Sequence, residues 1–217
     1  MKKSIAVLGM GRYGQFLTDA LCKQGADVLI ADDDEEMLQK YAGKVSCAVR
    51  ANLSEPDAIR NLGLNDVDTV VVSMGSSLEA SIMCVMVAKE LGVPNVIAKA
   101  ASLRMGEILT RVGADEIIYP EKESAEATGR RLLSADFLEF FSLGGGLCVF
   151  SIKPRKAWIG KSLRELRLRD QYRLNVVAIR ERGQSSASVD PDRPLTEHDE
   201  LYAVTERDNA DLFLISK

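Results

Sequence analysis

Residues 5–14 constrain the fold of this chain more than any other stretch. The apolar run at 5–8 leads directly into Gly9-Met10-Gly11-Arg12-Tyr13-Gly14, which is a G-x-G-x-x-G motif. A second apolar run, at 28–31, ends in Asp32, about 20 residues beyond the glycines. A buried strand, a glycine-rich turn, a helix and an acidic residue after the second strand are typical of the first β-α-β unit of a dinucleotide-binding fold.

Each glycine of the motif has its own expected role. Gly9 permits the tight turn, Gly11 lets a phosphate approach the backbone, and Gly14 lets the helix pack close to the strand. We place the start of that helix near Gln15, where free N–H groups and the helix dipole would favour a phosphate. Asp32 is placed to accept hydrogen bonds from ribose hydroxyls. The pattern predicts an adenine-nucleotide site; the alternative is a glycine-rich turn that binds nothing.

Strand and helix signals alternate regularly as far as residue 134. We expect strands at 5–8, 28–31, 46–49, 69–73, 96–98 and 116–119, and helices at 15–24, 35–41, 56–62, 78–91, 103–112 and 121–133. Six β-α units of this kind predict an α/β fold, a Rossmann-like doubly wound parallel sheet.

The regular alternation of strand and helix signals ends after residue 135. We expect strands at 137–143, 147–152, 174–179 and 201–204, a glycine turn at 144–146, and a long turn or hairpin at 181–194. A short helix at 163–168 would begin after Ser162, a suitable N-cap. The sequence therefore predicts a nucleotide-binding domain at 1–134 and a smaller α+β domain at 135–217.

Composition argues against several classes of protein. The chain has 217 residues, of which 46% are hydrophobic, and a formal net charge of −4. This acidic balance is unlike that of a general nucleic-acid-binding protein. No apolar run approaches the ~20 residues that a membrane-spanning helix needs, and the N-terminus lacks the pattern of a signal peptide. We therefore expect a cytoplasmic protein with a substantial core.

The sequence lacks recognisable patterns for catalysis. Its only histidine, His198, lies in a polar turn, and there is no P-loop, no S-x-x-x-Y-x-x-x-K pattern and no metal-ligand cluster. Four cysteines without C-x-x-C spacing are expected to be reduced core thiols: Cys22, Cys47, Cys84 and Cys148. A nucleotide site without visible chemistry favours a sensor. The alternatives are a small NAD-dependent oxidoreductase and the nucleotide-binding domain of a redox-sensing repressor.

Over essentially its full length the chain resembles the regulator-of-potassium-conductance (RCK) family, whose members are cytosolic partners of Ktr and Trk potassium transporters. The first half of the resemblance rests on G-M-G-R-Y-G at 9–14, A-N-L-S at 51–54, M-G-S-S-L-E-A-S at 74–81, I-A-K-A at 97–100, G-A-D at 113–115 and Y-P-E-K at 119–122. The second half rests on W-I-G-K-S-L at 158–163 and L-N-V-V-A-I at 174–179. The resemblance implies a regulatory subunit and not an enzyme.

The resemblance also implies which residues hold an adenine nucleotide, whether ATP, ADP or NAD(H). They are Gly9, Gly11, Arg12, Tyr13, Gly14, Asp32, Asp33, Asn52, Leu53, Met74, Gly75, Ser76, Lys99 and Glu121.

Two of these residues have competing interpretations. Arg12 would reach the phosphates of a nucleotide across a dimer interface, where its fork suits phosphate oxygens; alternatively it is an exposed cation on the first helix. Glu121 would help coordinate a cation such as Mg²⁺ near the phosphates; alternatively it is an acid that favours a helix start.

Asn52 departs from the family pattern, in which many relatives have aspartate. Asparagine keeps a carbonyl acceptor for the exocyclic amine of adenine and adds a donor. The three consecutive acids at 32–34 argue against NADP, whose 2′-phosphate requires a cation.

The resemblance further implies partners and assembly. A homodimer would assemble into an octameric ring or pseudo-ring, docked on a membrane potassium-translocating subunit of the Trk or Ktr type and peripheral to the inner face of the membrane. Helix 78–91 is a candidate for subunit contact, or else packs in the core. Some family members bind cyclic di-AMP in the second domain, where Arg169, Asn175 and Pro191 stand at comparable positions.

Overall fold

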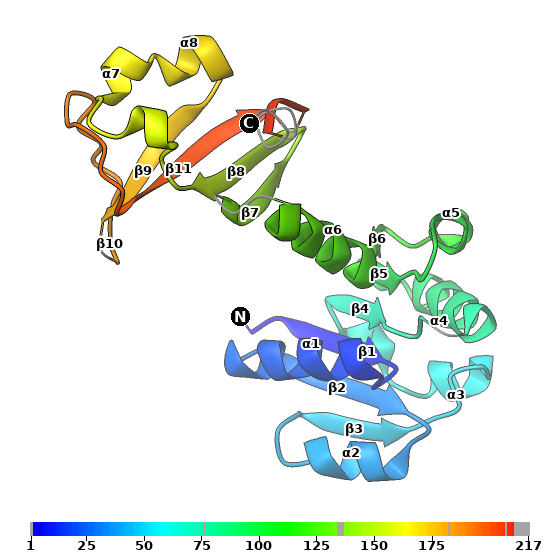
Figure 1. The fold of residues 1–217 in the computed structure, drawn as a ribbon. Coiled ribbons are helices and arrows are strands. Elements are labelled where there is room, and N and C mark those ends of the chain that lie inside the picture. Colours follow the sequence, from blue (N-terminus) through cyan, green and yellow to red (C-terminus); the bar gives the residue numbers. More distant parts are fainter. Residues whose placement is uncertain (1, 76, 134–136, 182, 207, 211–217) are drawn as a thin grey trace. The chain divides into compact units, whose positions relative to one another are not determined.

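A computed structural model describes residues 2–75, 77–133, 137–181, 183–206 and 208–210. The chain divides into two compact units, Met1–Glu123 and Ser124–Lys217 (Figure 1). The division falls inside helix α6 (Pro120–Leu133). The predicted domain boundary at 134/135 lies outside the described residues and stays a prediction.

The first unit is built on a six-stranded sheet with the order β3-β2-β1-β4-β5-β6. All five pairings are parallel. The strand order reverses between β1 and β4, which places a crevice at the carboxyl ends of these strands. The predicted Rossmann-like sheet is thus confirmed, with strands β1 (Ser4–Leu8), β2 (Asp27–Asp32), β3 (Cys47–Arg50), β4 (Thr69–Val72), β5 (Asn95–Lys99) and β6 (Glu116–Ile118).

Helices follow the strands nearly as the sequence predicts. They are α1 (Arg12–Lys23), α2 (Glu35–Tyr41), α3 (Pro56–Arg60), α4 (Leu78–Glu90), α5 (Leu103–Val112) and α6, with a 3-10 turn η1 (Leu64–Asp66). The predicted start of α1 near Gln15 is wrong. Gly11 is the N-cap, and the Gln15 N–H donates to the Gly11 carbonyl at 3.0 Å. Arg12 and Tyr13 therefore belong to the first helical turn.

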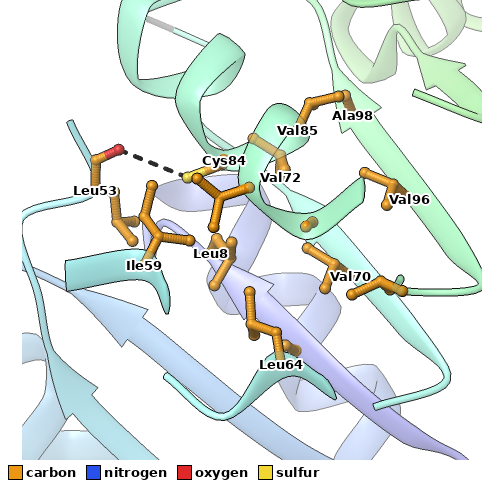
Figure 2. Close-up of a cluster of buried hydrophobic side chains, with 14 of the residues drawn as sticks. Leu8, Leu53, Ile59, Leu64, Val70, Val72, Cys84, Val85, Val96 and Ala98 are labelled. Atoms are coloured by element: carbon orange, nitrogen blue, oxygen red, sulfur yellow. Dashed lines mark hydrogen bonds between the residues drawn. The ribbon is translucent and has the colours of Figure 1, made fainter. Parts of the chain in front are cut away.

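Helix α4 packs against the sheet through a continuous apolar face. Figure 2 shows Cys84 and Val85 among buried side chains from β1, β4 and β5. Both are fully buried, as are Val70, Val72 and Val96, whereas Met86 on the same helix is 41% exposed. Each fully buried aliphatic side chain of this kind contributes roughly 1.5–3 kcal/mol. Packing in the core therefore explains most of the apolar side chains of α4.

The second unit contains a five-stranded sheet with the order β10-β9-β11-β8-β7. Its pairings are antiparallel. One face carries a separate core around Phe150, Trp158, Leu174 and Leu201. The strands are β7 (Phe137–Gly144), β8 (Leu147–Ile152), β9 (Asn175–Glu181), β10 (Gln184–Ser186) and β11 (Asp199–Glu206), and the short helices are η2 (Lys156–Trp158), α7 (Leu163–Leu166) and α8 (Leu168–Tyr172).

The helical segment of the second unit differs from its prediction. Ser162 caps α7 through a reciprocal capping box with Glu165, as its position predicts. The single helix expected at 163–168 is instead two helices, because Arg167 adopts a left-handed conformation with φ of +46°. This turn redirects the chain and allows α8 to form.

The cysteines differ in burial more than the sequence predicts. Cys84 and Cys148 are buried, but Cys22 is half-buried and Cys47 is exposed, so the expectation of four core thiols is wrong. Burial raises the pKa of the Cys84 thiol to about 12. His198 is exposed, as expected.

We expect a thiol reagent at about pH 8 to label Cys47 in the native protein, whereas Cys84 and Cys148 react only on unfolding, because the thiolate is the reactive species. Mass spectrometry of labelled peptides measures this directly. A Cys47→Ser variant should lose the fast reaction. Rapid labelling of Cys84 in the native protein would contradict its burial.

Candidate functional site

The site begins at the turn between β1 and α1. Gly9 has φ of +95°, in the left-handed region that favours glycine. A Cβ on Gly9 would lie 2.5 Å from Met74 Cγ, and one on Gly14 would collide with the Gly9 carbonyl oxygen. A Cβ on Gly11, in contrast, would meet no atom within 4 Å. Two glycines are therefore required by packing, whereas Gly11 leaves open space beside its backbone.

Hydrogen bonds from two other strands hold this turn. The Gly9 N–H donates to the Ala31 carbonyl at 2.8 Å, and the Ser73 N–H donates to the Leu8 carbonyl at 2.8 Å. The Ser73 hydroxyl donates to the Gly9 carbonyl. The turn is thus fixed to the ends of β2 and β4 before any ligand binds.

Asp32, the last residue of β2, also binds the turn. Its Oδ2 accepts the Met10 N–H at 2.5 Å, and its Oδ1 accepts the Asp34 N–H at 2.9 Å. Each carboxylate oxygen retains capacity for a further hydrogen bond. Asp32 can therefore hold the glycine turn and still accept from ribose hydroxyls. The Asp34 side chain instead caps α2 by accepting the Met37 N–H at 3.1 Å.

The loop after β3 forms another wall. The Oδ1 atom of Asn52 accepts the Ser54 N–H at 3.1 Å, and its Nδ2 atom donates to Glu55 Oε1 at 2.8 Å. The Leu53 side chain is 6% exposed and packs in the core. Asn52 consequently brings polar side-chain atoms to this wall, while Leu53 contributes mainly backbone.

Lys99, the last residue of β5, brings a positive charge to the cleft. The Lys99 side chain is 12% exposed, and its Nζ lies 2.6 Å from Glu121 Oε1 and 5.8 Å from the centre of the Tyr13 ring. The hydrogen bond from Lys99 lowers the pKa of Glu121. Burial raises the pKa of the Tyr13 phenol, and the charge of Glu123 acts in the same direction. Lys99 is therefore a cation held beside the glycine turn.

These groups line one cleft of about 910 Å³ within the first unit. Gly14 lies beneath the turn, and Ser76 is outside the described residues. The other predicted contact residues all line the cleft: Gly9, Gly11, Arg12, Tyr13, Asp32, Asp33, Asn52, Leu53, Met74, Gly75, Lys99 and Glu121.

Sequence reasoning missed several lining residues. Gln15, whose side chain donates to the Met10 carbonyl at 2.9 Å, follows from the early start of α1. Ser77 is recognisable as the N-cap of α4, where its hydroxyl accepts the Ala80 N–H at 3.2 Å. Met37 reaches the cleft from α2 and has no signal in the sequence.

The geometry limits what Glu121 could do with a metal. Within the described part of the chain, no three His, Cys, Asp or Glu side chains gather as a metal site. A cation beside Glu121 would need further oxygen ligands from a bound phosphate or from water.

A second hollow, of about 590 Å³, lies in the second unit and is bordered by α7 and α8. Arg164, Arg167 and Arg169 line it together with apolar residues and Pro191. The Arg169 guanidinium donates to Asn175 Oδ1 at 2.9 and 2.5 Å. Arg169 and Pro191 thus line one groove, whereas Asn175 does not line it and contacts it only through Arg169.

Among the described residues, no helix is both long enough and apolar enough to cross a membrane.

Both units contain segments that match known domain families. Residues 5–120 match the TrkA-N domain, and residues 148–214 match the TrkA-C domain. The chain is 33% identical over 180 residues to the Ktr system potassium uptake protein C of Bacillus subtilis (strain 168), covering 83% of this chain and 81% of the relative. It is 36% identical over 166 residues to the Ktr system potassium uptake protein A of Vibrio alginolyticus, covering 76% of each.

Among solved structures, the GsuK channel bound to NAD is similar with a TM-score of 0.64 at 15% identity. The similarity covers 100% of this chain and 40% of the GsuK chain, and it shows the fold alone. The TrkA-N match spans more than half of the chain, and both Ktr relatives are covered over more than two thirds of their length. The chain therefore belongs to the family of Ktr and Trk potassium uptake proteins that combine a TrkA-N with a TrkA-C domain.

Proposed function

We propose that this chain is a nucleotide-binding regulatory subunit of a Ktr- or Trk-type potassium transporter, and not an enzyme. One observation carries the proposal: Gly11 has open space beside its backbone at the start of a long helix, inside a cleft that also contains Asp32, Asn52 and Lys99. Membership of the potassium uptake family supplies the physiological context.

An adenine nucleotide fits the chemistry of this cleft. The N-terminus of α1 and Gly11 suit phosphate groups, Asp32 suits ribose hydroxyls, and Asn52 with Leu53 suits the adenine ring. ATP, ADP and NAD(H) share these parts, and the acids at 32–34 disfavour NADP. Structures of GsuK bound to NAD and to ADP have the same fold.

The phosphates would draw on two further groups. Arg12 is exposed in the first turn of α1 and would contact a nucleotide across a dimer interface. Glu121 would help hold Mg²⁺ or another cation beside the phosphates, once Lys99 turns toward them.

Regulation would act through assembly. The chain would form a homodimer and then an octameric ring on the membrane potassium-translocating subunit, as a cytoplasmic, peripheral component. Exposed apolar side chains on the first unit, Phe16 at 75% and Leu103 at 59%, support such contacts. A ligand that prefers one ring shape by ~100-fold shifts the equilibrium by about 2.7 kcal/mol.

The groove of the second unit is our proposed site for cyclic di-AMP. Three arginines suit two phosphates, and the apolar residues around them suit purine rings.

We expect Asp32→Ala to weaken ADP binding about tenfold or more, because a hydrogen bond to a charged group is lost. Isothermal titration with ATP, ADP, NADH and NAD⁺ measures this. Asp57→Ala is a matched control, since the Asp57 side chain is 93% exposed and lies outside the cleft. Failure of all four nucleotides to bind the unaltered protein would overturn the proposed function.

Two glycine variants should separate binding from packing. Gly11→Ala should retain the thermal midpoint, because φ at Gly11 is −62° and its Cβ meets no atom within 4 Å. It should nevertheless lose ADP affinity about tenfold or more, because the methyl group occupies the phosphate space. Gly14→Ala should instead destabilise the fold by ~1–3 kcal/mol through overpacking. Unchanged ADP affinity in Gly11→Ala would place the phosphates elsewhere.

The Lys99–Glu121 pair predicts a pH dependence of stability. Lys99 lowers the pKa of Glu121 below its ordinary value of 4.5. The stabilisation is therefore fully present above that value and is lost as the pH falls through the lowered pKa. Chemical denaturation of the unaltered protein and Glu121→Gln should differ at about pH 7 and converge as the pH falls through the lowered pKa of Glu121. A constant difference across this range would contradict the pairing.

A further inference from the structure

We propose that Glu55 is a positioning residue that fixes the Asn52 amide and thereby makes the cleft select adenine over purines with a 6-oxo group. This inference rests on the proposed function, because it requires a nucleotide in the cleft. Asn52, Leu53 and Ser54 line the cleft, whereas Glu55 lies behind them in the sequence and does not line it.

The loop after β3 holds the Asn52 amide at both ends. Nδ2 donates to Glu55 Oε1 at 2.8 Å, while Oδ1 accepts the Ser54 N–H at 3.1 Å. The backbone of the same loop is fixed as well, since the Glu55 N–H donates to the Asn52 carbonyl at 3.1 Å. The Ala51 N–H donates to the Asp32 carbonyl at 3.0 Å, which fixes the loop to the end of β2.

These partners permit one orientation of the amide. Rotation by half a turn would set the amide oxygen against the Glu55 carboxylate and the amide NH₂ against the Ser54 N–H. Both contacts would be repulsive. After the two existing bonds are counted, Oδ1 retains one acceptor site and Nδ2 retains one hydrogen.

The orientation of the amide decides which purine it can bind. Adenine has a 6-amino donor beside the N1 acceptor, whereas hypoxanthine and guanine have a 6-oxo acceptor beside an N1–H donor. A freely rotating amide can match either edge by turning over, but a fixed amide matches only one. A carboxylate partner, which only accepts, therefore converts an ambiguous side chain into a selective one.

Glu55→Gln separates this role from a structural one. A glutamine amide can pair with either end of Asn52, so the loop keeps a hydrogen bond, and the Ser54 N–H alone then opposes the reversed amide. Glu55 is the N-cap residue of α3 but makes no side-chain capping bond there, so the variant should retain the helix. Glu90→Gln, an equally conservative change at an exposed site outside the cleft, is the matched control.

The experiment is isothermal titration of the full chain with ADP and with IDP. The base of IDP differs from adenine at the 6-position and N1, and like adenine it has no 2-amino group. We expect the unaltered protein and Glu90→Gln to prefer ADP by about tenfold, the value of one selective hydrogen bond. Glu55→Gln should lower the ratio, chiefly by improving IDP binding, because one of the two restraints on the amide is removed.

A reciprocal exchange provides the second arm. Asn52→Asp alone should weaken ADP binding, because two carboxylates would face each other. Asn52→Asp combined with Glu55→Gln should recover the preference for ADP, because the carboxylate accepts from the 6-amino group, but only part of the affinity, because it has no hydrogen to donate to N1.

The outcomes distinguish the two proposals. If ADP binds and Glu55→Gln leaves the ADP-to-IDP ratio unchanged, or weakens both nucleotides equally, the role of Glu55 is overturned and the proposed function stands. If the unaltered protein binds neither nucleotide, the proposed function fails, and this inference fails with it.

Discussion

The close contact between the Gly9 carbonyl and Gly14 is the constraint on which the glycine turn depends. α1 can start directly beneath the turn because Gly14 has no Cβ, which would collide with that carbonyl. The Ser73 hydroxyl then binds the same oxygen from the end of β4, and Asp32 binds the Met10 N–H from the end of β2. One close backbone approach thus connects the three strands at which the sheet reverses its order.

Local patterns predict the first unit well because its elements are short, regular and buried. Helices α2 and α5 occupy the expected residues, and the sheet has the expected class. The start of α1 was misplaced because glycine at an N-cap carries no side-chain signal. Met37 was missed as a cleft residue because its role depends on how α2 lies over the sheet, and that position follows from packing between distant segments.

The second unit is less predictable from its sequence. The break between α7 and α8 depends on left-handed Arg167, and arginine has no preference for that conformation. In the groove itself, Arg164 pairs with Asp192 at 2.5 Å, and Arg167 pairs with Asp170 at 2.8 Å. An anionic ligand of this groove would have to replace these aspartates as the partner of each arginine. The net free energy gained from each new contact is therefore reduced.

The ion pair between Lys99 and Glu121 connects the cleft to helix α6. Glu121 lies in the first turn of α6, the helix in which one compact unit gives way to the other. Any anion that attracts Lys99 competes with Glu121 for the same ammonium group. The cleft and the start of α6 therefore share the Lys99 ammonium, and an anion that takes it from Glu121 would leave that carboxylate without its partner.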